Sequence, residues 1–343
     1  MADKVAVLTG GGDCPGLNPA IRGCVYRGLD HGFEFVGLQD GWRGLVEGIT
    51  MPLGLEQVEE IIGRGGTILG TSRTNPFKKE GAVERCLETF EQLGLHALVA
   101  MGGEDTLGVA TRFFKEHGLN VVGVPKTMDN DLSATDFTFG FDTSVTVAVD
   151  AAERLVDTGR SHRRVMILEV MGRHAGWVAL YTGMAAGADW ILLPEYAVDV
   201  DRMCEHLKTA HARKNVALVV ASEGITVPGM ETGKEERDEF GHMILRKRGV
   251  ADQLSGVIEE KTGIETRTAV IGHIQRGGSP TLFDRMLGTR VGVKAADLVA
   301  AGEFGQMAAL KGNDVVGVPL EEATGRLKTV PKEWEDLAEV FFK

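Results

Sequence analysis

The sequence predicts an α/β protein with two Rossmann-like domains, each a mainly parallel sheet flanked by helices. Short apolar runs alternate with longer helical patterns along the 343 residues, which is typical of strand–helix–strand units. Several runs end in glycine-rich turns, and ligands bind at the carboxyl ends of such strands. The length also suits about two domains of ~150 residues each.

Nine apolar or β-branched runs are expected to form strands, because each is shorter than a typical helix. In chain order they are residues 5–8, 33–38, 97–101, 121–124, 165–170, 190–193, 216–221, 268–271 and 315–318. Amphipathic stretches between them, such as residues 144–158 and 203–212, are expected to form helices that cover the sheets. The polar residues 231–241 and the basic residues 246–248 are expected to form an exposed excursion after a strand.

A change of domain is expected near Gly140 and again near residue 255, because the apolar runs before, between and after these points can fill two sheets. We therefore expect one domain of residues 1–140 and 256–305. Residues 141–255 and 306–343 are expected to form the second.

The composition excludes several classes of partner. A net charge of −12 argues against DNA or an anionic membrane held by bulk charge, so any phosphate site must be local. The four cysteines lack C-x-x-C spacing, which suits a reducing compartment. Neither a secretory signal pattern nor an apolar run near the ~20 residues of a membrane span is present in the sequence. We expect a cytoplasmic location.

Glycine is the compositional anomaly, with 46 residues, or roughly 13% against a ~7% average. The first run leads into Gly10, Gly11 and Gly12, and a helical pattern follows Gly16. Backbone N–H groups in such a turn can bind a phosphate, since no Cβ blocks the approach. The spacing matches neither the dinucleotide nor the P-loop fingerprint, so a tight strand-to-helix turn is the alternative.

A similar turn, Gly102 and Gly103, follows the run 97–101 and precedes a helix. Glu104 and Asp105 come next, at the positive end of that helix. They are either favourable helix-start charges or, in the case of Glu104, a ligand for Mg²⁺ between phosphates.

The run 121–124 is followed by Lys126, Asp129 and Asp131. Two carboxylates near a lysine can bind metal, abstract a proton and neutralise phosphate charge. A surface turn is the alternative, since Asn and Asp favour turns. Residues 161–177 and 267–280 concentrate arginines beside glycines, and the planar arginine fork suits phosphate. These segments indicate a phosphorylated substrate.

Taken together, these segments resemble the phosphofructokinase family from residue 4 to about residue 300. The motifs occur in family order: G-G-D-x-P-G-x-N from Gly11, G-G-T-x-L-G-T-x-R from Gly65, the G-G-[DE] turn, T-x-D-N-D from Thr127, M-G-R from Met171 and G-H-x-Q-R-G-G-S-P from Gly272. The resemblance implies a Mg²⁺-dependent enzyme that phosphorylates the 1-hydroxyl of fructose 6-phosphate. The first expected domain would bind the phosphoryl donor and the second the sugar phosphate.

The resemblance also implies roles for individual residues. Asp129 corresponds to the base that takes the hydroxyl proton, Asp131 supports metal or geometry, and Glu104 corresponds to an acid associated with Mg²⁺. Other members of the implied catalytic set are Lys126, Thr127 and Gly12. The implied donor-binding residues are Gly10, Gly11, Gly12, Arg73, Gly103 and Lys126. The implied sugar phosphate contacts are Arg164, Met171, Gly172, Arg173, Glu223, Arg267, His273 and Arg276.

Two positions distinguish pyrophosphate from ATP as the donor, because ATP-dependent relatives usually have glycine where this chain has Asp105 and Lys126. A carboxylate at Asp105 would repel the α-phosphate of a nucleotide by about 3 kcal/mol at ~5 Å and an effective dielectric near 20. Lys126 would neutralise the terminal phosphate of a smaller donor. We expect a pyrophosphate-dependent enzyme. The alternatives are an ATP-dependent 6-phosphofructokinase, a kinase with another acceptor, and a non-catalytic sugar-phosphate sensor.

Two further expectations follow from the resemblance. Arg164 and Arg267 match arginines that reach the active site of a neighbouring subunit, which implies a homodimer or homotetramer with shared sites. Arg22 matches the family's regulatory arginine cluster, whereas Tyr26 and residues 47–49 lack the arginines expected there. We therefore expect weak or no allosteric activation by nucleotides.

Overall fold

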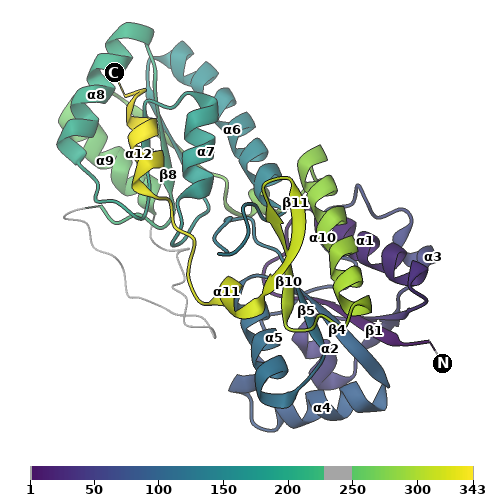
Figure 1. Cartoon of the computed structure of the whole chain (residues 1–343). Helices are drawn as coiled ribbons and strands as arrows, with labels where there is room; N and C mark the ends of the chain where they lie inside the picture. The colour runs from purple at the N-terminus through teal and green to yellow at the C-terminus, as the bar shows by residue number, and fades with distance from the viewer. Residues whose placement is uncertain (1, 228–248, 343) are drawn as a thin grey trace. The chain divides into compact units, whose positions relative to one another are not determined.

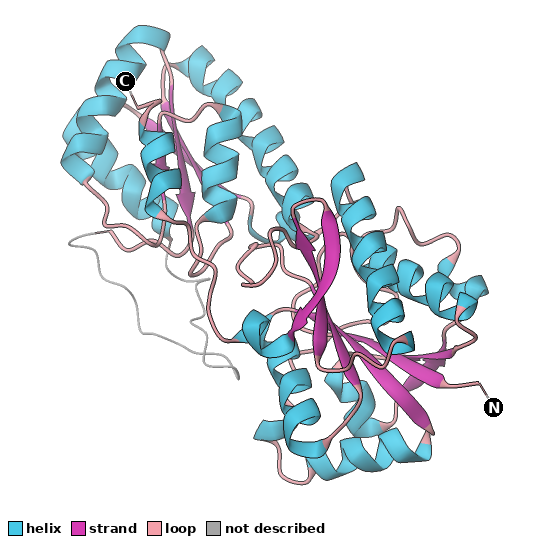
Figure 2. Cartoon of the chain, in the orientation of Figure 1, coloured by secondary structure: helices cyan, strands magenta, loops and turns pink. Residues whose placement is uncertain are grey.

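The computed structural model describes residues 2–227 and 249–342, and the polar and basic stretches at 231–241 and 246–248 lie outside these ranges. The chain divides into two compact units. Unit 1 comprises Met1–Met128, Leu132–Thr143 and Arg276–Leu327, and unit 2 comprises Asp129–Asp131, Ser144–Gln275 and Lys328–Lys343. Both contain sheets flanked by helices (Figure 2), which confirms the predicted fold class.

The sheet of unit 1 has seven strands among the described residues, in the order β11-β10-β5-β4-β1-β2-β3. Their bounds are β1 (Lys4–Thr9), β2 (Glu34–Leu38), β3 (Thr50–Pro52), β4 (Leu95–Gly102), β5 (Val121–Pro125), β10 (Gln306–Lys311) and β11 (Asp314–Pro319). The inner strands pair in parallel, while β3 and β11 are antiparallel edge strands. The sequence prediction missed β3 and β10, and the other five strands confirm predicted runs.

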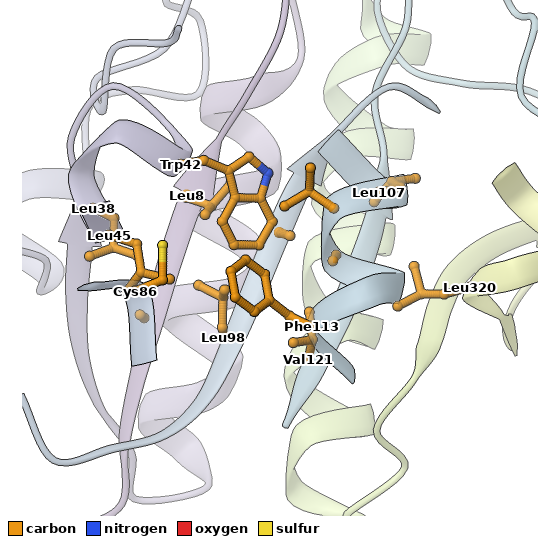
Figure 3. Close-up of a cluster of buried hydrophobic side chains, with 14 of the residues drawn as sticks. Leu8, Leu38, Trp42, Leu45, Cys86, Leu98, Leu107, Phe113, Val121 and Leu320 are labelled. Atoms are coloured by element: carbon orange, nitrogen blue, oxygen red, sulfur yellow. The ribbon is translucent and has the colours of Figure 1, made fainter. Parts of the chain in front are cut away.

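Helices cover both faces of this sheet (Figure 1). On one face lie α1 (Leu17–Asp30), α3 (Leu55–Val58) and α10 (Leu282–Ala300). On the other lie α2 (Trp42–Glu47), α4 (Ala82–Gln92), α5 (Glu104–His117) and α11 (Leu320–Thr324). Figure 3 shows this second face, where Phe113 and Trp42 pack over Leu98. Burying side chains of this size contributes about 1.5–3 kcal/mol each, and the packed helices keep the strand ends in place.

Unit 2 contains a four-stranded parallel sheet in the order β7-β8-β6-β9. The strands are β6 (Val165–Val170), β7 (Trp190–Leu192), β8 (Ala217–Ser222) and β9 (Thr266–Val270). One face packs against α8 (Val200–Lys214) and α9 (Val250–Thr262). The other face carries α6 (Phe141–His162) and α7 (Trp177–Ala186), and α12 (Lys332–Glu339) packs beside α7.

The observed units differ from the expected domain bounds in two long segments and two short ones. The short ones are Asp129–Asp131, which belongs to unit 2, and residues 141–143, which belong to unit 1. Residues 256–275 belong to unit 2, because β9 extends its sheet by pairing with β6. Residues 306–327 belong to unit 1, because β10 pairs with β5 and β11 with β10. The expected change near Gly140 is close to the observed one after Thr143.

The cysteine thiols are buried and free. Burial raises the pKa of Cys14, Cys24 and Cys86 to about 12, so these thiols stay protonated and unreactive at neutral pH. Within the described ranges, no helix combines the length and apolar character needed to cross a membrane.

Candidate active site

The turn after β1 is held by backbone hydrogen bonds. The N–H of Gly10 donates to Met101 O (3.0 Å) and that of Gly11 to Ser72 O (3.1 Å). Gly11 has a φ of 78°, a region that glycine adopts without steric cost. The N–H groups of Gly10 and Gly11 are therefore engaged within the protein, where they shape the turn.

The position of Thr106 explains why two residues in these turns are glycines. Its side chain is 4% exposed and occupies the space where a Cβ of Gly10 or Gly102 would lie. Because these glycines have no side chain, the turns after β1 and β4 can pack closely around Thr106. The sequence analysis did not identify Thr106, although it stands at a fixed offset in the G-G-x-x-T pattern.

Lys126 connects the same two turns. Its backbone N–H donates to Gly102 O (3.0 Å), and its Nζ donates to the carbonyl oxygen of Gly12. The side chain is 4% exposed, so the ammonium is held in place by its protein partners. A buried cation must be compensated by polar groups or by an anion. Lys126 therefore gives the carboxyl edge of this sheet a fixed positive charge.

Arg276 adds a second cation to the turn after β1. Its Nη1 donates to Asp13 O at 3.2 Å, and a Cβ at Gly12 would collide with the guanidinium. Glycine at position 12 is therefore required for this close approach. The structure thus brings together Gly12, Lys126 and Arg276, which were predicted from three separate motifs. Arg73, in contrast, is exposed.

Glu104 and Asp105 form the first turn of α5, after Gly103. The helix dipole favours negative charge there. Glu104 is exposed and Asp105 is half-buried. Both line an open pocket of about 300 Å³, together with Asn75, Phe77, Gly108, Val109, Arg112 and Thr324. The guanidinium of Arg112 lies 3.7 Å from the centre of the Phe77 ring, so a cation covers the aromatic surface of this pocket.

The segment after Lys126 carries the two predicted carboxylates. Thr127 O accepts a hydrogen bond from Thr138 Oγ1 (2.7 Å). Asn130 is buried and has a φ of 52°, a left-handed conformation that Asn tolerates better than most residues. Asp129 and Asp131 flank it and are both half-buried. The tight turn at Asn130 thus determines how the two carboxylates are presented.

In unit 2, the turns after β6 and β8 contact each other. Ser222 Oγ donates to Gly172 O, and Glu223 N donates to Val170 O (2.9 Å). A Cβ at Gly224 would collide with the carbonyl of Arg173. These contacts place Gly172, Arg173 and Glu223 together at the carboxyl edge of this sheet.

The carboxyl group of Glu223, at this edge, has a raised pKa. Burial, with a smaller contribution from the negative charge of Asp129, raises its pKa to about 7. The positive charge of Arg173 opposes the shift. The charges of Asp129 and Arg173 therefore both act on Glu223. Residues with shifted pKa values cluster at functional sites, so this group of charges is a candidate site.

Gln275 supports this edge and was missed by the sequence analysis. Its Oε1 accepts from the Met171 N–H (2.9 Å) and its Nε2 donates to Ser144 Oγ (3.1 Å). The side chain is fully buried, so it orients the backbone rather than contacting a ligand. Its position inside the G-H-x-Q-R motif was the available signal. His273, two residues earlier, is exposed.

The comparison with known proteins bears on this arrangement. The phosphofructokinase family, under the description "Phosphofructokinase", matches residues 4–299. The chain belongs to the phosphofructokinase family. It is 52% identical over 343 residues to a pyrophosphate--fructose 6-phosphate 1-phosphotransferase of Dictyoglomus thermophilum, an alignment that covers 99% of this chain and 98% of that relative.

Two other comparisons refine this result. The chain is 49% identical over 332 residues to ATP-dependent 6-phosphofructokinase 3 of Streptomyces coelicolor, with 96% of each chain covered. The solved structure of a pyrophosphate-dependent phosphofructokinase from Nitrosospira multiformis has a TM-score of 0.85 at 20% identity, covering 100% of this chain and 91% of that one. That likeness shows a shared fold. Overall identity separates the two donor classes only slightly, so the donor must be argued from individual residues.

Two predicted site residues of this phosphofructokinase lie away from the sugar-phosphate turns of unit 2. Arg164 precedes β6 and donates to Glu265 (2.8 and 3.0 Å), and Arg267, near the start of β9, also donates to Glu265. Met171 and Gly172 follow the opposite end of β6. Six residues of strand span about 20 Å, so the structure does not bring Arg164 and Arg267 to the sugar-phosphate turns of their own chain.

The described residues could bind Mg²⁺ only together with substrate phosphates. Among them, no three His, Cys, Asp or Glu side chains gather into a set that could hold a metal ion. Mg²⁺ is commonly bound by one or two carboxylates together with substrate phosphates and water. Glu104, exposed at the start of α5, suits that role, so the metal fits as a companion of the phosphoryl donor.

Proposed function

We propose that this phosphofructokinase catalyses reversible phosphoryl transfer from pyrophosphate to the 1-hydroxyl of fructose 6-phosphate, which gives fructose 1,6-bisphosphate and phosphate. The observation that carries the proposal is the buried Lys126 ammonium bonded to Gly12 O. It provides a fixed charge for a terminal phosphate, in a chain that also has Asp105 where a nucleotide would extend. The names of relatives above 50% identity support this donor.

Proton removal is assigned to Asp129. Its carboxylate takes the proton of the 1-hydroxyl as the oxygen attacks phosphorus, and Asp131 keeps the segment and any bound metal oriented. Lys126 is three residues from Asp129, and three residues of chain span at most about 11 Å. The cation that binds the donor and the base that activates the acceptor are therefore kept near each other by the chain itself.

Charge neutralisation supplies most of the acceleration in such a transfer. Lys126 binds phosphate oxygens of the donor, with Arg73 and the turn at Gly11, Gly12 and Gly103 beside it. The resemblance implied a sugar-phosphate contact for Arg276, but its guanidinium lies against the turn at Gly12, so we assign it to the donor phosphates instead. Glu104 would hold Mg²⁺ together with the donor, and the ion would supply positive charge against the negative charge that develops on the transferred group. Because an anhydride is exchanged for an ester and a phosphate, the reaction runs near equilibrium.

The sugar phosphate is bound by the turns of unit 2. Arg173 binds phosphate oxygens and Glu223 accepts hydrogen bonds from sugar hydroxyls, while Met171, Gly172 and His273 complete the contacts of this unit. Thr127, a residue of unit 1, is the remaining residue that we assign to the sugar phosphate. Arg164 and Arg267 serve the site of a second copy, since a strand length separates them from the turns of their own chain. The proposal therefore includes a homodimer or homotetramer with shared active sites.

An ATP-dependent 6-phosphofructokinase is the second candidate. The 49% identity to an ATP-dependent relative and the pocket of about 300 Å³ beside Asp105 favour it. Two features of the pocket argue against ATP. A nucleotide base needs an apolar surface, but the Arg112 guanidinium covers the Phe77 ring. The nucleotide phosphates need a path without negative charge, but the carboxylate of Asp105 lies there.

Initial rates with Mg²⁺, fructose 6-phosphate and either donor at matched concentration test the proposal. We expect turnover with pyrophosphate to exceed that with ATP by about 100-fold, as ~3 kcal/mol of repulsion implies, and we expect the reverse reaction with phosphate. Equal rates with the two donors would overturn the pyrophosphate assignment. Tight binding of fructose 6-phosphate without turnover of either donor would instead indicate a sensor.

A further inference from the structure

Lys328 is hydrogen-bonded to Asp131, Asn130 and Trp177 of unit 2, and the first two belong to the segment of the proposed base. Its backbone N–H donates to Asp131 O at 2.8 Å. Its Nζ donates to Asn130 Oδ1 at 3.2 Å. Its carbonyl accepts from Trp177 Nε1 at 2.8 Å. The sequence analysis did not identify Lys328, because it lies outside every recognised motif, 48 residues after the last one.

The Asn130 turn requires such support. Asn130 is 2% exposed and has a φ of 52°. A residue with a Cβ in this region costs about 1–2 kcal/mol, and the conformation persists only where neighbouring groups hold it. Asp129 and Asp131 are attached directly to this residue, so relaxation of the turn to an ordinary conformation would redirect both carboxylates.

Lys328 also links this turn to the turn that follows β6. Trp177, at the start of α7, comes one residue after Gly176 and donates to the Lys328 carbonyl. The Lys328 ammonium lies 5.5 Å from the centre of the Trp177 ring, within cation–π range. Trp177 in turn contacts the Trp334 ring of α12 at 6.0 Å. The C-terminal segment is thereby anchored where the Lys328 side chain reaches Asn130.

We propose that Lys328 is a positioning residue for the reaction: its ammonium holds Asn130 so that Asp129 and Asp131 keep the orientation needed for proton removal. The inference rests on the proposed role of Asp129. Lys328 acts through Asn130 and is not assigned a contact with substrate. A misplacement of a reacting group by about 1 Å can cost about 100-fold in rate, which is enough for a positioning effect to be measurable.

A purely structural anchor would behave differently, and Lys332 provides the matched control. It belongs to the same segment, and its ammonium lies 5.4 Å from the centre of the Tyr196 ring. Its Nζ pairs with Glu335 (2.5 Å) and Asp336 (3.1 Å) on α12. Lys332 therefore shares the charge and the aromatic contact of Lys328, but its described hydrogen bonds stay on its own helix.

The test compares Lys328→Met, Lys328→Arg and Lys332→Met in the full chain. Kinetic constants are measured for both substrates, with the melting temperature recorded for each variant. We expect Lys328→Met to lower kcat about 10- to 100-fold while KM for each substrate changes less than about threefold. Lys328→Arg, which keeps a cationic donor, should recover at least a tenth of the wild-type kcat. Lys332→Met should match the wild type.

A double-mutant cycle with Asn130→Gly completes the test. Glycine relieves the strained φ and removes the acceptor of the Lys328 bond, so adding Lys328→Met should lower kcat no further. Additive losses, a wild-type kcat in Lys328→Met, or a lower melting temperature with unchanged kcat per folded molecule would each overturn the inference. Lys328→Gln replaces Lys328→Met if the latter does not fold, with the same expectation.

The wild-type enzyme is first assayed with each donor. If ATP proves to be the donor, the assigned function fails, but the Lys328 comparison proceeds with ATP, so the two failures remain distinguishable.

Discussion

The Nζ of Lys126 donates a hydrogen bond to the carbonyl oxygen of Gly12, which fixes a buried cation against the turn after β1. Arg276 approaches the same turn, and its guanidinium occupies the space beside Gly12. Two cations from the ends of β5 and η3 (Gly272–Arg276) therefore meet at one glycine. The predicted effects on the donor follow from this arrangement.

Gly12→Ala should weaken pyrophosphate binding. The new Cβ would collide with the Arg276 guanidinium, which must move away from the turn. We expect kcat/KM for pyrophosphate to fall about 10- to 100-fold, because a misplaced cation stabilises the transition state less. Gly108→Ala is the control, since a Cβ there has no neighbour within 4 Å. Equal kinetics in the two variants would contradict the account of this turn.

The pair Asp105→Gly and Lys126→Gly should change the donor preference. Removing the carboxylate relieves about 3 kcal/mol of repulsion toward an α-phosphate, and removing the lysine weakens the hold on a small donor. We expect the double variant to use ATP with a kcat/KM at least about 10-fold above that of either single variant. Donor kinetics on the four proteins measure this. A double variant no better than the singles would show that repulsion at Asp105 is not what excludes ATP.

Glu223→Gln should make stability less dependent on pH. The pKa of Glu223 is raised from 4.5 to about 7, mainly by burial, so the folded chain binds more protons than the unfolded chain between these values. Stability from this group is fully present below pH 4.5 and is lost as pH rises through 7, by about 3 kcal/mol. The variant should be more stable than wild type at pH 8 and similar at pH 4.5. Urea unfolding at the two pH values tests this, and an equal gap at both would refute it.

Mixed oligomers should reveal shared sites. Asp129→Asn and Arg164→Ala chains, each weakly active alone, should regain about a quarter of wild-type activity when co-assembled as dimers, because half of the dimers are hybrids with one intact site of two. Asp129→Asn mixed with Lys126→Met is the control, since both defects fall in the same chain's contribution to a site. Restored activity in the control, or none in the first mixture, would exclude this use of Arg164.

Nucleotide activation should be weak or absent. The Arg22 guanidinium lies 4.2 Å from the centre of the Tyr26 ring, so the arginine that resembles a regulatory residue is stacked on the tyrosine that stands where a second arginine was expected. We expect ADP to change the fructose 6-phosphate saturation curve little or not at all. A marked shift toward lower KM would mean that another cationic cluster binds the effector.

Local sequence patterns were enough to predict much of the fold and of the candidate site. The run at 165–170 forms β6 with the same bounds, and Gly172, Arg173 and Glu223 meet at the carboxyl edge of the sheet. Such features depend on residues close in sequence, so a single chain displays them. Strand partners are different, because the pairing of β9 with β6 joins segments about 100 residues apart in sequence, and no periodic pattern encodes it. Because of that pairing, residues 256–275 belong to unit 2 and not to the domain in which they were expected.

The sequence by itself determined that this is an α/β chain with phosphofructokinase motifs, because apolar periodicity and contiguous motifs are local properties. Only the tertiary structure decided that the N–H groups of Gly10 and Gly11 are used within the protein, that Thr106 fills the space beside the glycines, and that Lys328 reaches Asn130. The reason is physical: burial, hydrogen-bond partners and close approach arise from contacts between distant segments, which exist only once the chain has folded.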